Sequence, residues 1–237
     1  MKINIVMVGV SRPSSQRIIE NINNNILFFR NTYPQHTFDF IVCTYINESY
    51  NDILKYCEES KLFHYFIEPI HASDIPKELE QYMYKSSPDF ISKNRYRMFY
   101  SMNYVINKIP DEYDVVIRLR IDTEIKSFEL FDNIKPNIYY TVIDTETSCS
   151  DNIGYAKLEV MKKVWDLKNC FIKAHNNETL VYNAILKNSY SIQQFKFDYI
   201  LYQNNSDMFD GVLQWSKSNR RWIYDGKTYI RGQHLNN

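Results

Sequence analysis

One stretch of the sequence, residues 113–126, constrains the fold of this chain more than any other. It reads Tyr-Asp-Val-Val-Ile-Arg-Leu-Arg-Ile-Asp-Thr-Glu-Ile-Lys, and its apolar, β-branched start is typical of a strand buried on both faces of a sheet. Side chains alternate between the faces of a strand, so its ionisable residues would share one face while the extended geometry lasts. These residues are Arg118, Arg120, Asp122 and Glu124. Such groups are costly to bury unless they pair, bind a ligand or hold a metal ion.

The first half of the chain predicts an α/β fold. Apolar runs predict strands at 3–10, 38–45 and 62–70, and helical periodicity predicts helices between them at 16–33 and 51–60. This alternation implies a parallel sheet wound with right-handed crossovers. Ligands of such sheets sit at the carboxyl ends of the strands. We therefore expect a site around residues 9–12, 45–48 and 69–73.

The second half adds helices, strands and one polar loop. Helices are predicted at 75–84, from Ser87 to about Lys108, through 160–167 and at 176–187. Strands are predicted at 137–143 and 192–202. A polar loop at 144–152 follows the first of these strands and leads to the helix through 160–167. The chain from Asn204 onward is polar and aromatic without a strong period, which suggests a lid or wrapping segment. All 237 residues fit one large domain.

Composition and missing motifs exclude several classes of protein. The 28 basic and 28 acidic side chains cancel, so no basic footprint for nucleic acid is visible. Four scattered cysteines indicate reduced thiols in a cytosol-like compartment. No apolar run has the length of a membrane span, and the N-terminus lacks a signal-peptide pattern. The first strand is followed by neither a Gly-x-Gly-x-x-Gly motif nor a Walker motif, so these nucleotide-binding classes lose support.

The pair Asp122 and Glu124 is the strongest chemical signal. Two carboxylates at the end of a strand offer the oxygen ligands that Mg²⁺ and Mn²⁺ prefer. The alternative is that Arg118 and Arg120 form buried ion pairs with these or other acids and serve packing alone.

A family resemblance starts from the same residues. An α/β first half, then a helix, then the segment ending Arg-Leu-Arg-Ile-Asp-Thr-Glu resembles the Asp-x-Asp region of GT-A glycosyltransferases. It is most similar to small viral and bacterial enzymes that carry an Arg-x-Asp-x-Asp/Glu version. Residues 9–12 before a helix resemble the opening of that group, 150–154 its acceptor-side segment, and Asn177-Glu178 a later acidic helix start. The resemblance spans about residues 3–190.

This resemblance implies a GT-A-like fold with a Rossmann-like, mostly parallel central sheet flanked by helices, and a C-terminal wrapping segment. The single domain, 1–237, would comprise a nucleotide-sugar-binding half (1–126), an acceptor-side half (127–203) and a C-terminal segment or lid (204–237). The implied activity is transfer of a sugar from a UDP- or GDP-sugar donor to a hydroxyl of a glycan or other acceptor, with Mn²⁺ or Mg²⁺. The implied location is the cytoplasm, which is the host cytoplasm if the protein is viral.

The resemblance also assigns roles to residues on the donor side. Asp122 would lie near the ribose and the metal, and Glu124 would be the more direct metal ligand. Candidates to contact the donor are Arg12, Arg95 and Arg120. A surface position remains the alternative for both Arg12 and Arg95.

An inverting enzyme would also need a general base within reach of the acceptor hydroxyl. Asp151 is the first choice and Glu178 the second, and each could instead be a carboxylate that only stabilises a helix start. His175 and His234 stay open as metal ligands. Two other functions also stay open: a nucleotidyltransferase that makes a nucleotide-sugar, and an inactive module that binds a glycan or a protein.

Overall fold

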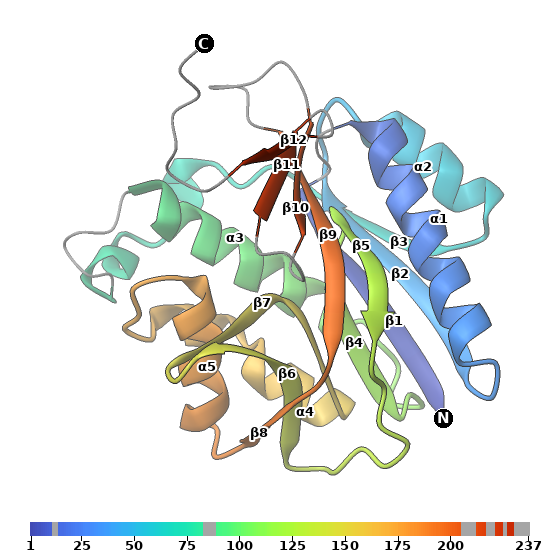
Figure 1. Cartoon of the computed structure of the whole chain (residues 1–237). Coiled ribbons are helices and arrows are strands. Elements are labelled where there is room, and N and C mark those ends of the chain that lie inside the picture. The colour runs from blue at the N-terminus through green and yellow to red at the C-terminus, as the bar shows by residue number, and fades with distance from the viewer. Residues whose placement is uncertain (11–13, 83–88, 205–211, 217–220, 225–226, 230–237) are drawn as a thin grey trace.

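A seven-stranded sheet runs through the computed structural model, with helices on both faces (Figure 1). Its strand order is β3-β2-β1-β4-β7-β6-β8. The structure describes residues 1–10, 14–82, 89–204, 212–216, 221–224 and 227–229, with side chains except at 89–92, at 144 and after 201. Arg12 and His234 therefore lie outside the described residues.

The first half folds as the sequence predicts. β1 (Lys2–Gly9), β2 (Thr37–Tyr45) and β3 (Phe63–Ile67) are parallel neighbours, and β4 (Val115–Arg120) pairs in parallel with the other side of β1. α1 (Ser15–Thr32) and α2 (Tyr50–Glu59) form the crossovers. The side chain of Ser14 accepts a hydrogen bond from the Arg17 backbone N–H at 3.3 Å, which caps the start of α1.

The prediction of a polar loop at 144–152 is wrong. β6 (Ile138–Thr145) and β7 (Ser148–Ala156) form an antiparallel hairpin there, and β7 also pairs antiparallel with β4. Ser148, Ser150 and Asp151 are buried although they are polar. Because neighbours cover both faces of β7, its side chains show no apolar alternation that would reveal a strand.

Two predicted strands each turn out to be two strands in different sheets. The stretch 113–126 contains β4 and then β5 (Thr123–Phe128), and the stretch 192–202 contains β8 (Ser191–Gln194) and then β9 (Phe197–Asn204). β5 and β9 belong to a second, five-stranded sheet of order β12-β11-β10-β9-β5. This sheet is completed by β10 (Val212–Ser216), β11 (Arg221–Tyr224) and β12 (Lys227–Tyr229), in the segment without a sequence period.

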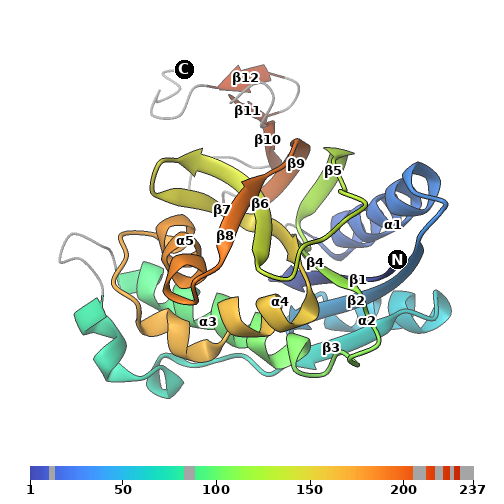
Figure 2. The ribbon, with the colours of Figure 1, turned by 90° about the horizontal axis from the view of Figure 1, so that it is seen from below.

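Two hydrophobic clusters fill the two sides of the large sheet, and Figures 1 and 2 show the elements that cover each side. α3 (Asp89–Ile106), α4 (Leu158–Val164) and α5 (Asn177–Lys187) cover one face, where Phe99 packs against Trp165. α1, α2 and the second sheet cover the other, where Phe29 packs against Phe128. Short 3₁₀ turns are η1 (Ala72–Asp74), η2 (Lys77–Tyr82) and η3 (Leu167–Phe171).

η2 lies where the sequence predicts a short helix at 75–84. Within the described residues, no helix is both long enough and apolar enough to cross a membrane.

Candidate functional site

A cavity of about 250 Å³ opens at the carboxyl ends of β1 and β4. It is close to the lower end of small-molecule sites, which are roughly 300–1,000 Å³. Val8, Gly9 and Val10 contribute the end of β1, and Tyr45 the end of β2. Gly9 has a φ of +146°, a backbone conformation that side-chain-bearing residues rarely adopt. The cavity thus lies where the strand order predicts a ligand site.

α3 provides one wall of the cavity. The lining residues from this helix are Asn94, Arg97, Met98 and Ser101. Their spacing of three, four and seven residues places them on one face of the helix. The Arg97 guanidinium donates a hydrogen bond from Nη2 to the backbone carbonyl of Ile70 at 2.7 Å.

The opposite wall carries most of the charge. Arg118 and Arg120 come from β4, Asp122 from the turn between β4 and β5, and Asp151 from β7. Asn177 adds an amide from the first turn of α5. The structure therefore brings together three of the predicted site residues: Arg120, Asp122 and Asp151.

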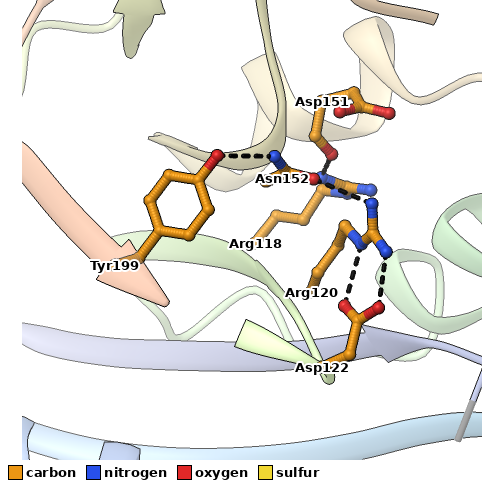
Figure 3. A network of polar contacts seen from close by, with 6 residues as sticks. All are labelled: Arg118, Arg120, Asp122, Asp151, Asn152 and Tyr199. Carbon is orange, nitrogen blue, oxygen red and sulfur yellow. Dashed lines mark hydrogen bonds and ion pairs between the residues drawn. The ribbon is translucent and has the colours of Figure 1, made fainter. Parts of the chain in front are cut away.

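Arg120 and Asp122 form the centre of a polar network (Figure 3). Arg120 Nε donates to one carboxylate oxygen of Asp122 at 2.9 Å, and Nη2 donates to the other. Arg120 Nη1 donates to Asn152 Oδ1 at 3.0 Å, and Asn152 Nδ2 donates to the hydroxyl of Tyr199 at 3.1 Å. The network links β4 and β7 of the large sheet to β9 of the second sheet.

Arg118 is bound differently from Arg120. It is 2% exposed, and its Nη1 donates to the backbone carbonyl of Asp151. Its guanidinium carbon lies 4.4 Å from the centre of the Trp165 ring, a cation–π contact. Burial lowers the pKa of Arg118 to about 10, although the Asp151 charge opposes this shift. Burial alone would lower the Arg120 pKa as well, but the charge and hydrogen bonds of Asp122 outweigh it and raise that pKa.

The carboxylates fit a divalent cation in part. Asp122 lines the cavity, whereas Glu124 does not, and the Glu124 carboxylate forms an ion pair with Lys126. In the described part of the chain, no group of three or more His, Cys, Asp or Glu side chains is placed to hold a metal ion. Mg²⁺ is usually held by one or two carboxylates together with substrate phosphates. A carboxylate also has about four acceptor positions, so Asp122 can accept from Arg120 and still bind a cation.

The sequence suggests either a donor contact or a surface position for Arg95, and the structure shows neither. It is fully buried and does not line the cavity. Its guanidinium donates to the backbone carbonyls of Tyr82, Ile172 and Ala174, the last at 2.7 Å. Arg95 thus fastens the segments around η2 and η3 to α3. The apolar helix stripe could have shown this, because Arg95 precedes Phe99 by four residues and so shares the buried face.

Sequence reasoning missed several polar residues of the lining, among them Arg97 and Asn177. The sequence could have indicated Arg97, because helical spacing places it beside the apolar stripe of α3 and not within it. Glu178 and His175 lie beside Asn177 in the chain, at the start of α5, but they are not among the lining residues. Their predicted roles stay predictions.

Comparisons with known proteins complete the description. No protein-family model matches the chain, and no curated protein matches it in sequence. Among solved structures, the chain is similar to mouse xyloside xylosyltransferase 1 in its apo form, with a TM-score of 0.50 and 11% identity over 82% of this chain and 85% of that one. It is also similar to a mutant of Drosophila β-1,4-galactosyltransferase 7 in complex with manganese, UDP-Gal and xylobiose.

The galactosyltransferase match has a TM-score of 0.46 and 8% identity over 81% of this chain and 64% of that one. The xylosyltransferase match concerns the fold alone at this identity. It confirms the predicted fold class, an α/β, GT-A-like architecture with a mostly parallel central sheet flanked by helices.

Proposed function

We propose that this protein is a glycosyltransferase that moves a sugar from a nucleotide-sugar donor to a hydroxyl acceptor in glycan assembly. The observation that carries the proposal is the cavity at the ends of β1 and β4, where Asp122 and Asp151 line one space together with arginines. The fold shared with a xylosyltransferase supports it. Nucleotide binding at the carboxyl ends of parallel strands is general in α/β sheets.

The donor would bind on the side of Asp122. A UDP- or GDP-sugar brings a diphosphate, and Arg97 and Arg120 offer guanidinium groups that suit phosphate oxygens. Asp122 would hold Mn²⁺ or Mg²⁺, with Glu124 as the second carboxylate. A bound divalent cation supplies Lewis-acid stabilisation of the charge that develops on the leaving diphosphate.

Asp151 would act on the acceptor side. The two arginines lie between its carboxylate and that of Asp122 (Figure 3), so the two acids can serve different reactants. As general base, the Asp151 carboxylate takes the proton of the acceptor hydroxyl while this oxygen bonds to the anomeric carbon. The bond from that carbon to the donor phosphate oxygen breaks, and the nucleoside diphosphate leaves with the electron pair. Glu178 remains the second candidate for the base.

The test is donor hydrolysis or sugar transfer with UDP- and GDP-sugars in the presence of Mn²⁺. Asp151→Asn should lower kcat by about 100-fold or more, since positioned acid–base groups contribute ~10²–10⁴-fold. Asp122→Asn should also lower the rate, because it removes a charged ligand of the metal ion. Glu124→Ala should raise the Mn²⁺ concentration needed for half-maximal rate. Asp132→Asn is the control, because the Asp132 side chain is 92% exposed and is not among the residues that line the cavity. Equal rates in the wild type, Asp122→Asn and Asp151→Asn would contradict the proposal.

A further inference from the structure

Arg118 is a buried cation that faces the cavity without a carboxylate partner among the described residues. Its hydrogen bond goes to a neutral group, the backbone carbonyl of Asp151, and its Nε has no hydrogen-bond partner in the described part of the chain. The Asp151 carboxylate attracts it at longer range. The Trp165 ring covers one side of the guanidinium, so water has little access to it.

The contrast with Arg120 shows that this arrangement is not imposed by the strand. Arg120 lies two residues further along β4 and has a bidentate carboxylate partner in Asp122, as well as the Asn152 amide. Its pKa is raised, whereas burial lowers that of Arg118. Arg118 and Arg120 lie on one face of β4, but their positive charges are therefore balanced by nearby groups to very different degrees.

The charge of the cavity lining is unbalanced in the same direction. Its described charged residues are three arginines and two aspartates. Asp122 is engaged by Arg120, and Arg97 donates to a backbone carbonyl. A buried ion without a close counter-ion is strongly unfavourable, so such a group is typical of a site whose ligand supplies the opposite charge.

Asn177 is a second residue of the cavity lining with a polar group that needs a partner. Its Oδ1 atom is buried and accepts no hydrogen bond from any residue that the structure describes, although Asn177 lines the cavity. A carbonyl oxygen can only accept. An anion beside Arg118 and a hydroxyl or N–H donor beside Asn177 would complete the contacts of these two groups. A sugar that carries an acidic group would supply both.

We propose that Arg118 is the anion-binding residue of this cavity and receives the carboxylate or phosphate of a hydroxylated ligand, with Asn177 accepting from one of its hydroxyls. The ligand class is an acidic sugar or a sugar phosphate, including the phosphate of a nucleotide-sugar. The description of the ligand as a sugar rests on the proposed function. Anion binding itself does not, and it can be measured without turnover.

Arg95 provides a matched control for this role. Like Arg118, it is a buried arginine that donates to backbone carbonyls, has an unpartnered Nε and has its pKa lowered by burial. Unlike Arg118, it does not line the cavity. If Arg118 only held a carbonyl in place, the two arginines would respond alike to substitution.

The experiment measures binding by calorimetry at constant ionic strength in chloride. The probes are pyrophosphate, glucuronate and, as a neutral comparison, glucose, and the proteins are the wild type, Arg118→Met, Arg118→Lys and Arg95→Met. The wild type should bind at least one anionic probe more tightly than glucose. Arg118→Met should weaken that binding at least tenfold, Arg118→Lys should retain part of it, and Arg95→Met should lower Tm while its Kd stays near that of the wild type.

The pattern of probes identifies the source of the anion. Arg118-dependent binding of pyrophosphate alone indicates a phosphate ligand, and that of glucuronate alone indicates the carboxylate of an acidic sugar. Anion binding that is absent in the wild type, or unchanged in Arg118→Met, overturns the proposal. If Arg118→Met does not fold, Arg118→Gln takes its place. If the wild type binds anions through Arg118 but transfers no sugar, the proposed function is refuted and the anion site is still supported.

Discussion

Arg120 engages both carboxylate oxygens of Asp122, so any ligand of Asp122 shares that carboxylate with a guanidinium. This pairing compensates two buried charges at once, since Asp122 is 2% exposed and would be costly to bury alone. It also holds the carboxylate in one orientation. Asp122 is thus held in place without a ligand, which is the preorganisation that the proposed donor site would require.

The cysteines lead to a prediction about pH. Burial raises the pKa of Cys43 from 9.0 to about 12. In the unfolded chain this thiol ionises above pH 9, whereas in the folded protein it keeps its proton, so the contribution to stability is full below pH 9 and is lost as pH rises towards 12. The free energy of unfolding should fall by about 1 kcal/mol from this thiol between pH 9 and pH 10.

Urea denaturation at pH 8, 9 and 10 measures this loss, and Cys43→Ala is the comparison. The variant should lose less stability over this interval than the wild type, whatever its absolute stability at pH 8. Identical slopes for the two proteins would contradict the assignment to Cys43. Cys57 and Cys170 have pKa values raised in the same direction by burial, so part of the slope should remain in the variant.

Asn25 connects two elements that the sequence does not reveal as neighbours. From α1, its Nδ2 donates to the Thr123 carbonyl at 2.7 Å, and its Oδ1 accepts from the Ile125 backbone N–H at 2.9 Å. β5 is the edge strand of the second sheet, so this one side chain satisfies backbone groups that otherwise lack a strand partner.

Replacing Asn25 by Ala should therefore destabilise the protein strongly. Two buried backbone groups lose their partner, and each unsatisfied group costs about 1–3 kcal/mol, so the expected loss is about 2–6 kcal/mol in urea denaturation. Asn24→Ala is the matched control, since Asn24 is exposed on the same helix, and it should be neutral or slightly stabilising. A similar small effect for both variants would show that this connection does not stabilise the fold.

Elements with a one-sided or continuous apolar pattern were the predictable ones. β1, β2 and the helices α1, α3 and α5 lie close to their predicted ranges, because periodicity and capping residues are local signals. β7 was not predictable, since its buried polar residues follow no period. Nor was the division of 113–126 into β4 and β5, because both parts are extended and only their pairing partners differ.

The two sheets are joined at the site by the hydrogen bond from Asn152 to Tyr199. We predict that Tyr199→Phe and Asn152→Ala destabilise the protein less than additively when combined. The coupling energy should be about 0.5–1.5 kcal/mol, the net value of one such bond. Denaturation of the two single variants and the double variant completes this cycle. Strict additivity would mean that the bond does not couple the sheets.

The candidate site is an assembly of parts from distant regions of the chain. Asn152 is 32 residues from Arg120, and Tyr199 is a further 47 residues on. Sequence reasoning found Asp122 and Arg120 because they end one buried strand, and it found Asp151 through the family resemblance. It could not find Asn177 or the separate roles of Arg118 and Arg120, since these depend on which groups from other strands and helices lie opposite each side chain.

The sequence by itself therefore determined the α/β class, the order of the first strands and helices, and the sheet edge at which the cavity lies. These follow from local periodicity, from capping and from the handedness of parallel crossovers. Only the tertiary structure decided that residues 113–126 leave one sheet for another beside Asp122, and that Arg95 is buried while Arg97 lines the cavity. It also decided that Arg118 has no close counter-ion among the residues that the structure describes. The physical reason is that a buried charge is defined by its partners, and those partners come from residues far away in the chain.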